Sequence, residues 1–359
     1  YGVMSGTSMA TPYVSGAIAL YLKSLEGKTR PSPQFIFEHF QHYAYKTTVN
    51  NTVSDLDTPL RQGAGLVQVY DTITQKVHLT PGQISFNDTA TKRCKTEMIT
   101  ITNRGDETVK YSIKNNVTLS IRPYNLKKSG YTYVQPINYT TDAAYLRFSK
   151  KFITLQPGES AKVQVRVYPP HTNPDEHIMY GGYIQFESQD TDTSLDLTVP
   201  YFGVVGKQKD LPIFDQPNGF PYLSNKEDGS IIFDKNETLV IHRDSKKHPQ
   251  QQSAYLFSRF LTPTALIETE LLDGRTGKVL GQAFKPFTYN PRNTLNEGEQ
   301  TQYDKWTGKY FPSSSKSLTS INAPNGVYRL RMKALHVFGN PRVASDYDIW
   351  VSPLIHIRP

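Results

Sequence analysis

The chain has 359 residues, which is long enough for two or three domains with hydrophobic cores of their own. Hydrophobic residues make up 37% of it, and no run approaches the roughly 18 consecutive apolar residues that a membrane helix needs. The net charge is +8, but the basic residues are scattered in short clusters such as Lys150-Lys151 and no nucleic-acid motif accompanies them, so we expect a solvated basic surface.

The first element is Gly2–Gly16, GVMSGTSMATPYVSG, which places Ser8 on a glycine-led turn that runs into an apolar helix. A small residue before the serine lets a substrate backbone approach. The helix N-terminus supplies unpaired N–H groups and partial positive charge where an oxyanion would form. Pro12 is expected in the first helical turn, which has no use for its N–H. The helix body is apolar nearly all round, so we expect it to be buried.

The segment GTSMATP, followed by a V-[SA]-G-[AV] helix, resembles the nucleophile segment of the subtilisin-like serine proteases, the subtilases. The resemblance implies that Ser8 is the catalytic serine and that its backbone N–H is one oxyanion donor. It also implies that Gly6 and Thr7 border the substrate channel. Tyr13 departs from the family, which usually has His there, but that His has no part in the triad. The alternative is a Gly/Ser/Thr-rich turn before a buried helix.

In that family the catalytic Asp, the catalytic His and the oxyanion Asn all precede the serine, and only seven residues precede Ser8 here. The chain is therefore expected to be the C-terminal part of a longer protease, and to be inactive alone. His39 and His42 follow on the next predicted helix, but nothing in their context places either against Ser8.

Residues 1–76 have a helical pattern. Ser32-Pro33 predicts the start of a second helix. A third helix is predicted to open at Gln62–Val69, with Leu66, Val69, Tyr70 and Ile73 along one face. Its Gly-Ala-Gly-Leu-Val segment resembles the closing part of subtilase catalytic domains, which implies that residues 1–76 are the end of such a domain.

Near Val77 the hydrophobic period changes to two. Thr96–Thr102 alternates strictly, and the Asn103–Asp106 turn before Thr108–Ile113 predicts a hairpin. Many short strands with turns between them predict an antiparallel β-sandwich over residues 77–206. The segments ITITNRGDETVKYSI, LQPGESAKVQVRV, YGGYIQF and LTVPYFGVVG also resemble the fibronectin type III-like domain of large extracellular subtilases, among them the peptidases that cleave complement anaphylatoxin and extracellular fungal relatives.

A polar passage, Lys207–Gly229, leads into a third region that is again strand-like, in which Gly298–Ser317 is predicted to be a long loop around Trp306. We expect a second accessory β-sandwich over residues 207–359. The predicted fold is therefore multidomain: a helical remnant of an α/β catalytic domain over 1–76, followed by two antiparallel β-sandwiches, 77–206 and 207–359.

Glycosylation sequons indicate the cellular compartment of the protein better than its cysteine content does. Cys94 is the one cysteine, so no intrachain disulfide forms. Five Asn-x-Thr tripeptides offer acceptor asparagines, and with the family resemblance they favour a secreted, glycosylated protein. The acceptors are Asn50, Asn87, Asn116, Asn138 and Asn236.

Metal and cofactor signals are weak. His39 and His42 have ligand spacing but lack a third ligand, and packing is the favoured interpretation. Asp190, Asp192 and Asp196 lack the glycine and the terminal Glu of a calcium loop, so a solvated turn is favoured. We expect no metal and no cofactor in this segment, which leaves open a calcium ion elsewhere in the full-length protein.

The predicted function is peptide-bond hydrolysis by a serine endopeptidase, with Ser8 as nucleophile and His and Asp supplied from upstream. Expected partners are protein or peptide substrates and, through the β domains, a cell wall or cell surface; no nucleic acid is expected. The alternative is a non-catalytic secreted adhesion or binding protein that carries a protease remnant.

Overall fold

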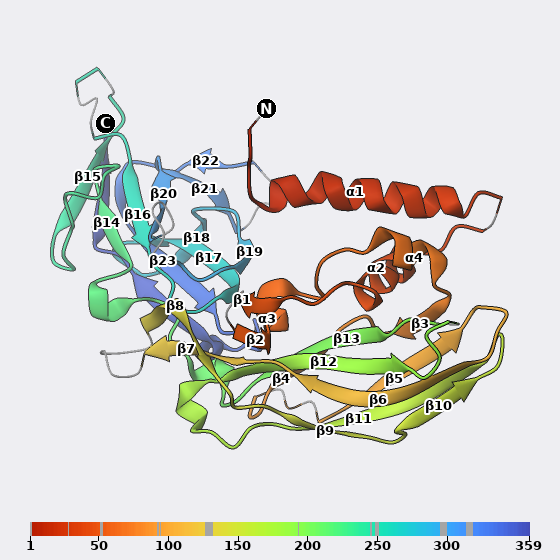
Figure 1. The fold of residues 1–359 in the computed structure, drawn as a ribbon. Coiled ribbons are helices and arrows are strands. Elements are labelled where there is room, and N and C mark those ends of the chain that lie inside the picture. Colours follow the sequence, from red (N-terminus) through yellow and green to blue (C-terminus); the bar gives the residue numbers. More distant parts are fainter. Residues whose placement is uncertain are drawn as a thin grey trace. The chain divides into compact units, whose positions relative to one another are not determined.

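The structure is a computed structural model that describes residues 2–27, 29–50, 53–91, 93, 95–125, 132–192, 194–244, 246–247, 251–294, 300–313 and 319–359 (Figure 1). Cys94 and the Asn51-Thr52 part of the first sequon lie outside these residues. The chain forms two compact units. Unit 1 comprises Tyr1–Pro123 and Pro136–Lys207, and unit 2 comprises Tyr124–Gln135 and Gln208–Pro359.

The α-helices of the described chain lie near its start, as the sequence predicts, and only short 3₁₀ turns follow them. The α-helices are α1 (Thr7–Ser24), α2 (Pro33–His42), α3 (Pro59–Gln62) and α4 (Val69–Thr74), with a two-stranded sheet of β1 (Thr48–Asn50) and β2 (Val53–Leu56) between α2 and α3. The start of α2 is confirmed: the Ser32 hydroxyl accepts a hydrogen bond from the Phe35 N–H at 3.2 Å, and Pro33 occupies the first turn.

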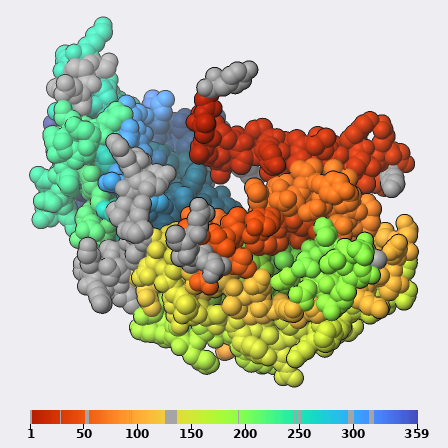
Figure 2. Space-filling view, viewed as in Figure 1, coloured from red at the N-terminus to blue at the C-terminus, as the bar shows by residue number. Residues whose placement is uncertain are grey.

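The expectation that the first helix is buried all round is wrong. Only Ala17 and Tyr21 of α1 are buried, because one side of the helix packs on α2 and α4 while most residues on its other sides are exposed. Figure 2 shows α1 as a continuous ridge at the surface of unit 1. The apolar side chains that this leaves exposed include Met9, Tyr13 and Leu20.

The third predicted helix begins later than expected. Leu66 pairs with Tyr45 in an isolated β-bridge, and α4 begins only at Val69. Gly65 explains the delay: it has φ +119°, and a Cβ there would lie 2.3 Å from the Tyr45 carbonyl oxygen. The segment around Gly65 and Leu66 is therefore extended and lies against Tyr45, just after α2. A helix that started at Gln62 could not make this close backbone contact.

Two sheets enclose the core of unit 1. In the described chain one has seven strands: β10 (Phe152–Leu155), β6 (Val109–Val117), β12 (Met179–Ser188), β13 (Leu197–Val204) and β4 (Ile84–Asp88) in that order, extended by β7 (Ser120–Asn125) and β8 (Thr132–Thr140). The other is β3 (Val77–Thr80), β5 (Thr96–Asn103), β11 (Ser160–Tyr168) and β9 (Tyr145–Phe148). On β11, Val163, Val165 and Val167 face the core and alternate with exposed polar residues.

The helical part covers the outer face of the larger sheet. The Tyr183 hydroxyl donates to the Gly63 carbonyl oxygen at 2.9 Å, and Pro59 lies against Gly181 so closely that a Cβ there would be 3.1 Å from it. Because both faces of β12 and β13 are covered, these strands are nearly continuously buried instead of alternating.

Unit 2 also contains two sheets. The first is β14 (Tyr222–Ser224), β16 (Ala254–Ser258) and β20 (Gln302–Trp306). The second follows the order β15 (Thr238–His242), β25 (Leu354–Arg358), β23 (Gly326–Leu335), β17 (Thr264–Asp273), β18 (Val279–Gln282), β21 (Lys309–Pro312) and β22 (Ile321–Asn322), with β19 (Phe287–Asn290) on β17 and β24 (Tyr347–Val351) on β23. The two sheets share a core around Trp306, Leu330 and Ile355.

Two features of the β regions differ from the prediction. The sheets are not wholly antiparallel, because β4 pairs parallel with β13 and β15 pairs parallel with β25. In each pair the strands are far apart in the chain, so no hairpin imposes the antiparallel direction. The loop predicted at Gly298–Ser317 contains β20 and β21, which are joined at Gly308 with φ +78°; the Trp306 Nε1 donates to the Lys309 carbonyl oxygen at 2.6 Å.

The chain is thus mostly β-sheet after a small helical part, which confirms the predicted class at that level. None of the helices in the described ranges combines the length and the hydropathy that a membrane crossing requires.

Candidate active site

Ser8 lies in the first turn of α1, at the exposed end of the helix. The N–H groups of Met9 and Ala10 both donate to the Gly6 carbonyl oxygen, at 3.0 and 3.1 Å. The N–H groups of Thr7 and Ser8 come before the first N–H that has an acceptor within the helix, and no side chain caps the helix. The turn therefore presents a serine hydroxyl beside N–H donors at the positive end of an 18-residue helix dipole.

Gly6 sets the direction from which the chain enters this turn. Its φ of +150° lies in the region that favours glycine, whereas a Cβ would meet only the Met9 sulfur at 3.8 Å. Backbone conformation, and not lack of space, therefore requires a glycine two residues before Ser8. The predicted substrate-binding residues Gly6 and Thr7 lie here, both exposed.

Pro12 lies further along α1 than the sequence suggested. Since the helix starts at Thr7, Pro12 falls in its second turn, where its nitrogen would have paired with the carbonyl of Ser8. The Ser8 carbonyl consequently lacks that intrahelical donor. The next turns are reinforced by hydroxyls: Thr11 Oγ1 donates to the Thr7 carbonyl oxygen at 2.8 Å, and Ser15 Oγ donates to the Thr11 carbonyl oxygen at 2.9 Å.

No described residue forms a hydrogen bond with the Ser8 hydroxyl. His39 and His42 are buried, with 3% and 0% of their surface exposed, and they bind backbone carbonyls. His39 Nε2 is 3.0 Å from the Thr72 oxygen, and His42 Nε2 is 2.7 Å from the Leu79 oxygen. Neither ring is available to take a proton from Ser8.

These histidines belong to a buried cluster that joins α2 to β3. The centroid of the His78 ring lies 5.7 Å from that of His39 and 5.1 Å from that of His42, and Phe35 stacks on His78 at 4.0 Å. Burial lowers the pKa of His42 to about 3 and that of His39 to about 4. Both rings are therefore neutral structural groups at pH 7, and the packing interpretation fits them.

The five predicted glycosylation asparagines lie in different surroundings. Asn50, Asn138 and Asn236 are exposed, at the end of β1, in β8 and in the turn before β15. Asn87 is half-buried at a positive φ of 57°. Asn116 lies within β6, where its amide donates to the Gln185 Oε1 at 3.3 Å.

The acidic residues near the β12–β13 turn are engaged within the protein. Asp196 accepts hydrogen bonds from the Ser188 N–H and the Gln185 amide, both at 2.8 Å, and Asp190 Oδ1 accepts from the Asp192 N–H at 3.2 Å. In the described part of the chain, no group of three or more His, Cys, Asp or Glu side chains is arranged to hold a metal ion.

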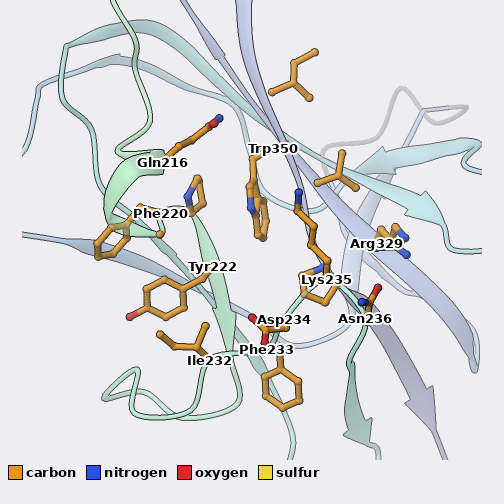
Figure 3. A pocket seen from close by; sticks show the side chains of 15 residues that line it. Gln216, Phe220, Tyr222, Ile232, Phe233, Asp234, Lys235, Asn236, Arg329 and Trp350 are labelled. Atoms are coloured by element: carbon orange, nitrogen blue, oxygen red, sulfur yellow. The ribbon is translucent and has the colours of Figure 1, made fainter. Parts of the chain in front are cut away.

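Sequence reasoning missed a cleft of about 850 Å³ in unit 2, where aromatic side chains face polar ones (Figure 3). Its lining comes from the segment before β14, from the chain leading into β15, and from β23 and β24. The signal in the sequence was weak, because these aromatic residues are spread over 130 positions from Phe220 to Trp350 and only the fold brings them together.

Comparisons with known proteins agree with the architecture. Residues 1–65 match the subtilase family, and residues 84–202 match the Fn3-like domain family. A PII-type proteinase of Lactococcus lactis subsp. cremoris is 25% identical over 96% of this chain, as is a PIII-type proteinase of strain SK11, and a PII-type proteinase of Lacticaseibacillus paracasei is 24% identical over the same share. The chain spans about a fifth of the length of these relatives.

Similar solved structures add little. A PapD-like domain of human CEP192 has 18% identity and a TM-score of 0.26 over 36% of this chain and 84% of that one, and the fimbrial chaperone CfaA has 9% identity and a TM-score of 0.30 over 77% and 98%. Scores this low carry no argument about fold or function.

The two family matches and the proteinase relatives lead to one conclusion: a subtilase-family segment at residues 1–65 is followed by an Fn3-like domain at residues 84–202, so the chain is similar to the C-terminal part of a large subtilase.

Proposed function

We propose that this chain is part of a subtilisin-like serine endopeptidase in which Ser8 is the nucleophile. The observation that carries the proposal is the geometry at the start of α1: an exposed serine, entered through a glycine at φ +150°, beside N–H groups that have no intrahelical acceptor. That arrangement is what acyl transfer to a serine requires.

In the proposed reaction, the Ser8 Oγ attacks the carbonyl carbon of the scissile peptide while its proton passes to a histidine base. The Ser8 N–H donates to the oxyanion. The C–N bond then breaks, the histidine returns the proton to the departing amine, and water hydrolyses the acyl-enzyme. Gly6 and Thr7 border the substrate.

The base, its orienting aspartate and the oxyanion asparagine are proposed to come from residues outside these 359. This proposal rests on the surroundings of Ser8, whose hydroxyl has no partner in the described part of the chain, and of the buried histidines. We accordingly propose that residues 1–359 alone do not hydrolyse peptides. The missing segment would also cover the exposed apolar side chains of α1.

We further propose that residues 1–76 complete the catalytic domain, that residues 77–206 and 207–359 form two β-sandwich domains, and that the protein is secreted, acts on protein or peptide substrates and is associated with a cell wall or surface. The exposed acceptors Asn50, Asn138 and Asn236 support glycosylation there more strongly than Asn87 and Asn116 do. We propose no cofactor in this segment.

The test is labelling of the full-length protein with a serine-directed fluorophosphonate, followed by mass spectrometry of the labelled peptide. We expect the label on Ser8 and none on the Ser8→Ala variant. Ser15→Ala is the matched control, because Ser15 lies on the same helix with its hydroxyl already donated to the Thr11 carbonyl. Absence of labelling, or equal labelling of Ser8→Ala, would favour a non-catalytic binding protein instead.

A further inference from the structure

The cleft of unit 2 has two chemically different sides. Figure 3 shows the Trp350 indole between the rings of Phe220 and Tyr222 on one side and the Lys235 and Arg329 side chains on the other. Tyr222 is held by a stacked contact with Phe257, with centroids 5.0 Å apart and planes at 6°. This contact orients the Tyr222 ring, and the aromatic side is partly open to solvent.

The polar side is not saturated by contacts within the protein. No described residue accepts a hydrogen bond from the Trp350 indole N–H or pairs with the Lys235 ammonium. Arg329 gives one N–H to the Ser352 carbonyl oxygen at 2.5 Å and keeps its remaining donors. Rings beside unused donors suit a ligand that has an apolar face and a rim of oxygen atoms.

A sequon lies in the wall of this cleft. Asn236 is one of the lining residues, and Asn236-Glu237-Thr238 forms the turn that enters β15. The side chains of Asn236 and Thr238 are exposed, and neither has a hydrogen-bond partner in the described structure. The Glu237 Oε2 accepts from the Asp234 N–H at 2.7 Å, which fixes the turn while leaving the Asn236 amide free.

We propose that Asn236 carries an N-linked glycan whose first sugar rings fold back into the cleft and pack on Trp350. A pyranose presents C–H groups on one face, which suits the electron-rich face of an indole, while its hydroxyl and acetamido groups reach the donors of Lys235 and Arg329. The volume of about 850 Å³ lies within the range of binding sites for small ligands.

The attachment is a group transfer from a polyprenyl-diphosphate-linked oligosaccharide. The Asn236 Nδ2 forms a bond to the anomeric carbon of the first sugar and loses one proton. The bond from that carbon to the diphosphate oxygen breaks, and the polyprenyl diphosphate leaves with its electron pair. Asn236 is reachable by the transferase because the cleft wall is exposed.

The consequence is a covalently filled cleft. The glycan would cover the Trp350 ring and the exposed Ile232 side chain, which is 58% accessible, and would hold the turn before β15 against β24. Covering apolar surface in this way stabilises unit 2, because area is removed from water without the cost of binding a free ligand.

This inference rests on the proposed secretion of the protein. The test is therefore designed so that failure of the glycan inference can be told apart from failure of the proposed secretion. The full-length protein is produced in a eukaryotic secretory host as wild type, Thr238→Ala and Thr238→Ser; the last keeps the sequon. Glycopeptide mass spectrometry measures the occupancy of Asn236. Acrylamide quenching of tryptophan fluorescence, compared with the Trp350→Phe variant of each form, isolates the accessibility of Trp350 from the signals of all other tryptophans.

We expect Asn236 to be occupied in the wild type and in Thr238→Ser, and Trp350 to be quenched more strongly in Thr238→Ala than in either. Equal quenching despite an occupied Asn236 overturns the packing. An unmodified Asn236 beside glycans on other sequons overturns this inference alone, while five unmodified sequons contradict the proposed glycosylation as well. Protection of Trp350 in Thr238→Ala by added N,N′-diacetylchitobiose, with Asn236 unmodified in the wild type, would assign the cleft to an external saccharide and overturn the attached glycan.

Discussion

The Nε2 atom of His78 lies 3.1 Å from the Oε2 atom of Glu38, and both side chains are buried between α2 and β3. The Thr80 hydroxyl donates to the same carboxylate oxygen at 3.0 Å, and the Gln34 amide donates to the other oxygen at 3.0 Å. This contact ties the helical part of unit 1 to the first strand of the β region, so the two share one buried polar network.

Unit 1 is predicted to lose stability in acid because of this network. Burial lowers the pKa of His42 to about 3 and that of His39 to about 4. Burial, together with the charges of His39 and Arg104, lowers the pKa of His78 to about 3. Since the unfolded chain binds protons near pH 6.5 and the folded chain does not, stability is complete above that pH and falls as the pH drops toward 3, by at most about 1.4 kcal/mol per pH unit for each histidine.

Denaturant unfolding at several pH values checks this. His42→Gln should flatten the acid limb of the stability curve, whereas His171→Gln, at an exposed loop residue, should leave it unchanged. An acid limb of equal slope in all three proteins would show that other groups cause the loss.

Tyr21 is predicted to hold α1 in place. It is 6% exposed, and its ring lies edge-on to Phe40 with the centroids 5.8 Å apart. Tyr21→Ala should cost about 3–5 kcal/mol at this contact, as for other large buried aromatic residues. Hydrogen exchange in α1 measures the effect. Tyr13→Ala, whose side chain lies on the same helix but is 59% exposed, should leave the exchange rates nearly unchanged; similar rates in both variants would contradict the packing.

Gly6 is predicted to be essential for placing Ser8. A side chain at φ +150° costs about 1–3 kcal/mol of strain. Gly6→Ala should therefore lower kcat/KM of the full-length protein by about 5- to 150-fold. Gly16→Ala is the control, because no atom of the described residues lies within 4 Å of the added Cβ. That variant should keep its activity and gain about 1 kcal/mol in helix stability. Loss of activity in Gly16→Ala but not in Gly6→Ala would contradict the claim that the backbone conformation of Gly6 places Ser8.

Lys46 is predicted to be unusually reactive toward amine reagents. It lines a cavity of about 390 Å³ in unit 1, and burial lowers its pKa to about 8 against the opposing charge of Asp196. Labelling by an acylating reagent, followed by mass spectrometry, should show a midpoint near pH 8 for Lys46 in the folded protein. In urea the midpoint should move up toward the ordinary value for lysine of about 10.4. A midpoint that unfolding leaves unchanged would show that burial does not set this pKa.

The local signals in the sequence predicted much of this fold. Ser32-Pro33 marks the start of α2, and the strict alternation of Thr96–Thr102 marks β5, because capping and strand periodicity depend on neighbouring residues alone. The exposure of α1 and the late start of α4 were not predictable in this way. Both depend on what packs against them, as at Gly65, where the carbonyl of Tyr45 occupies the space of a side chain.

The sequence proposes a nucleophile at Ser8, whereas the surroundings of the histidines and the cleft come from the fold. A seven-residue motif is the basis for proposing Ser8 as nucleophile, whereas the burial of His39 and His42 arises from residues distant in sequence, including Leu79 and Thr198. The cleft around Trp350 is likewise a product of tertiary structure. Sequence patterns therefore indicate a site formed by one short segment better than a site formed by several segments that are distant in the chain.

The most direct measurement for the central proposal is peptide hydrolysis by the full-length protein with and without the Ser8 hydroxyl. Ser8→Ala should lower kcat by about 10⁶-fold, the loss that follows removal of the nucleophile from a serine protease triad, whereas Ser15→Ala should keep wild-type activity. A Ser8→Ala protein that hydrolyses peptides at the wild-type rate would contradict the assignment of Ser8.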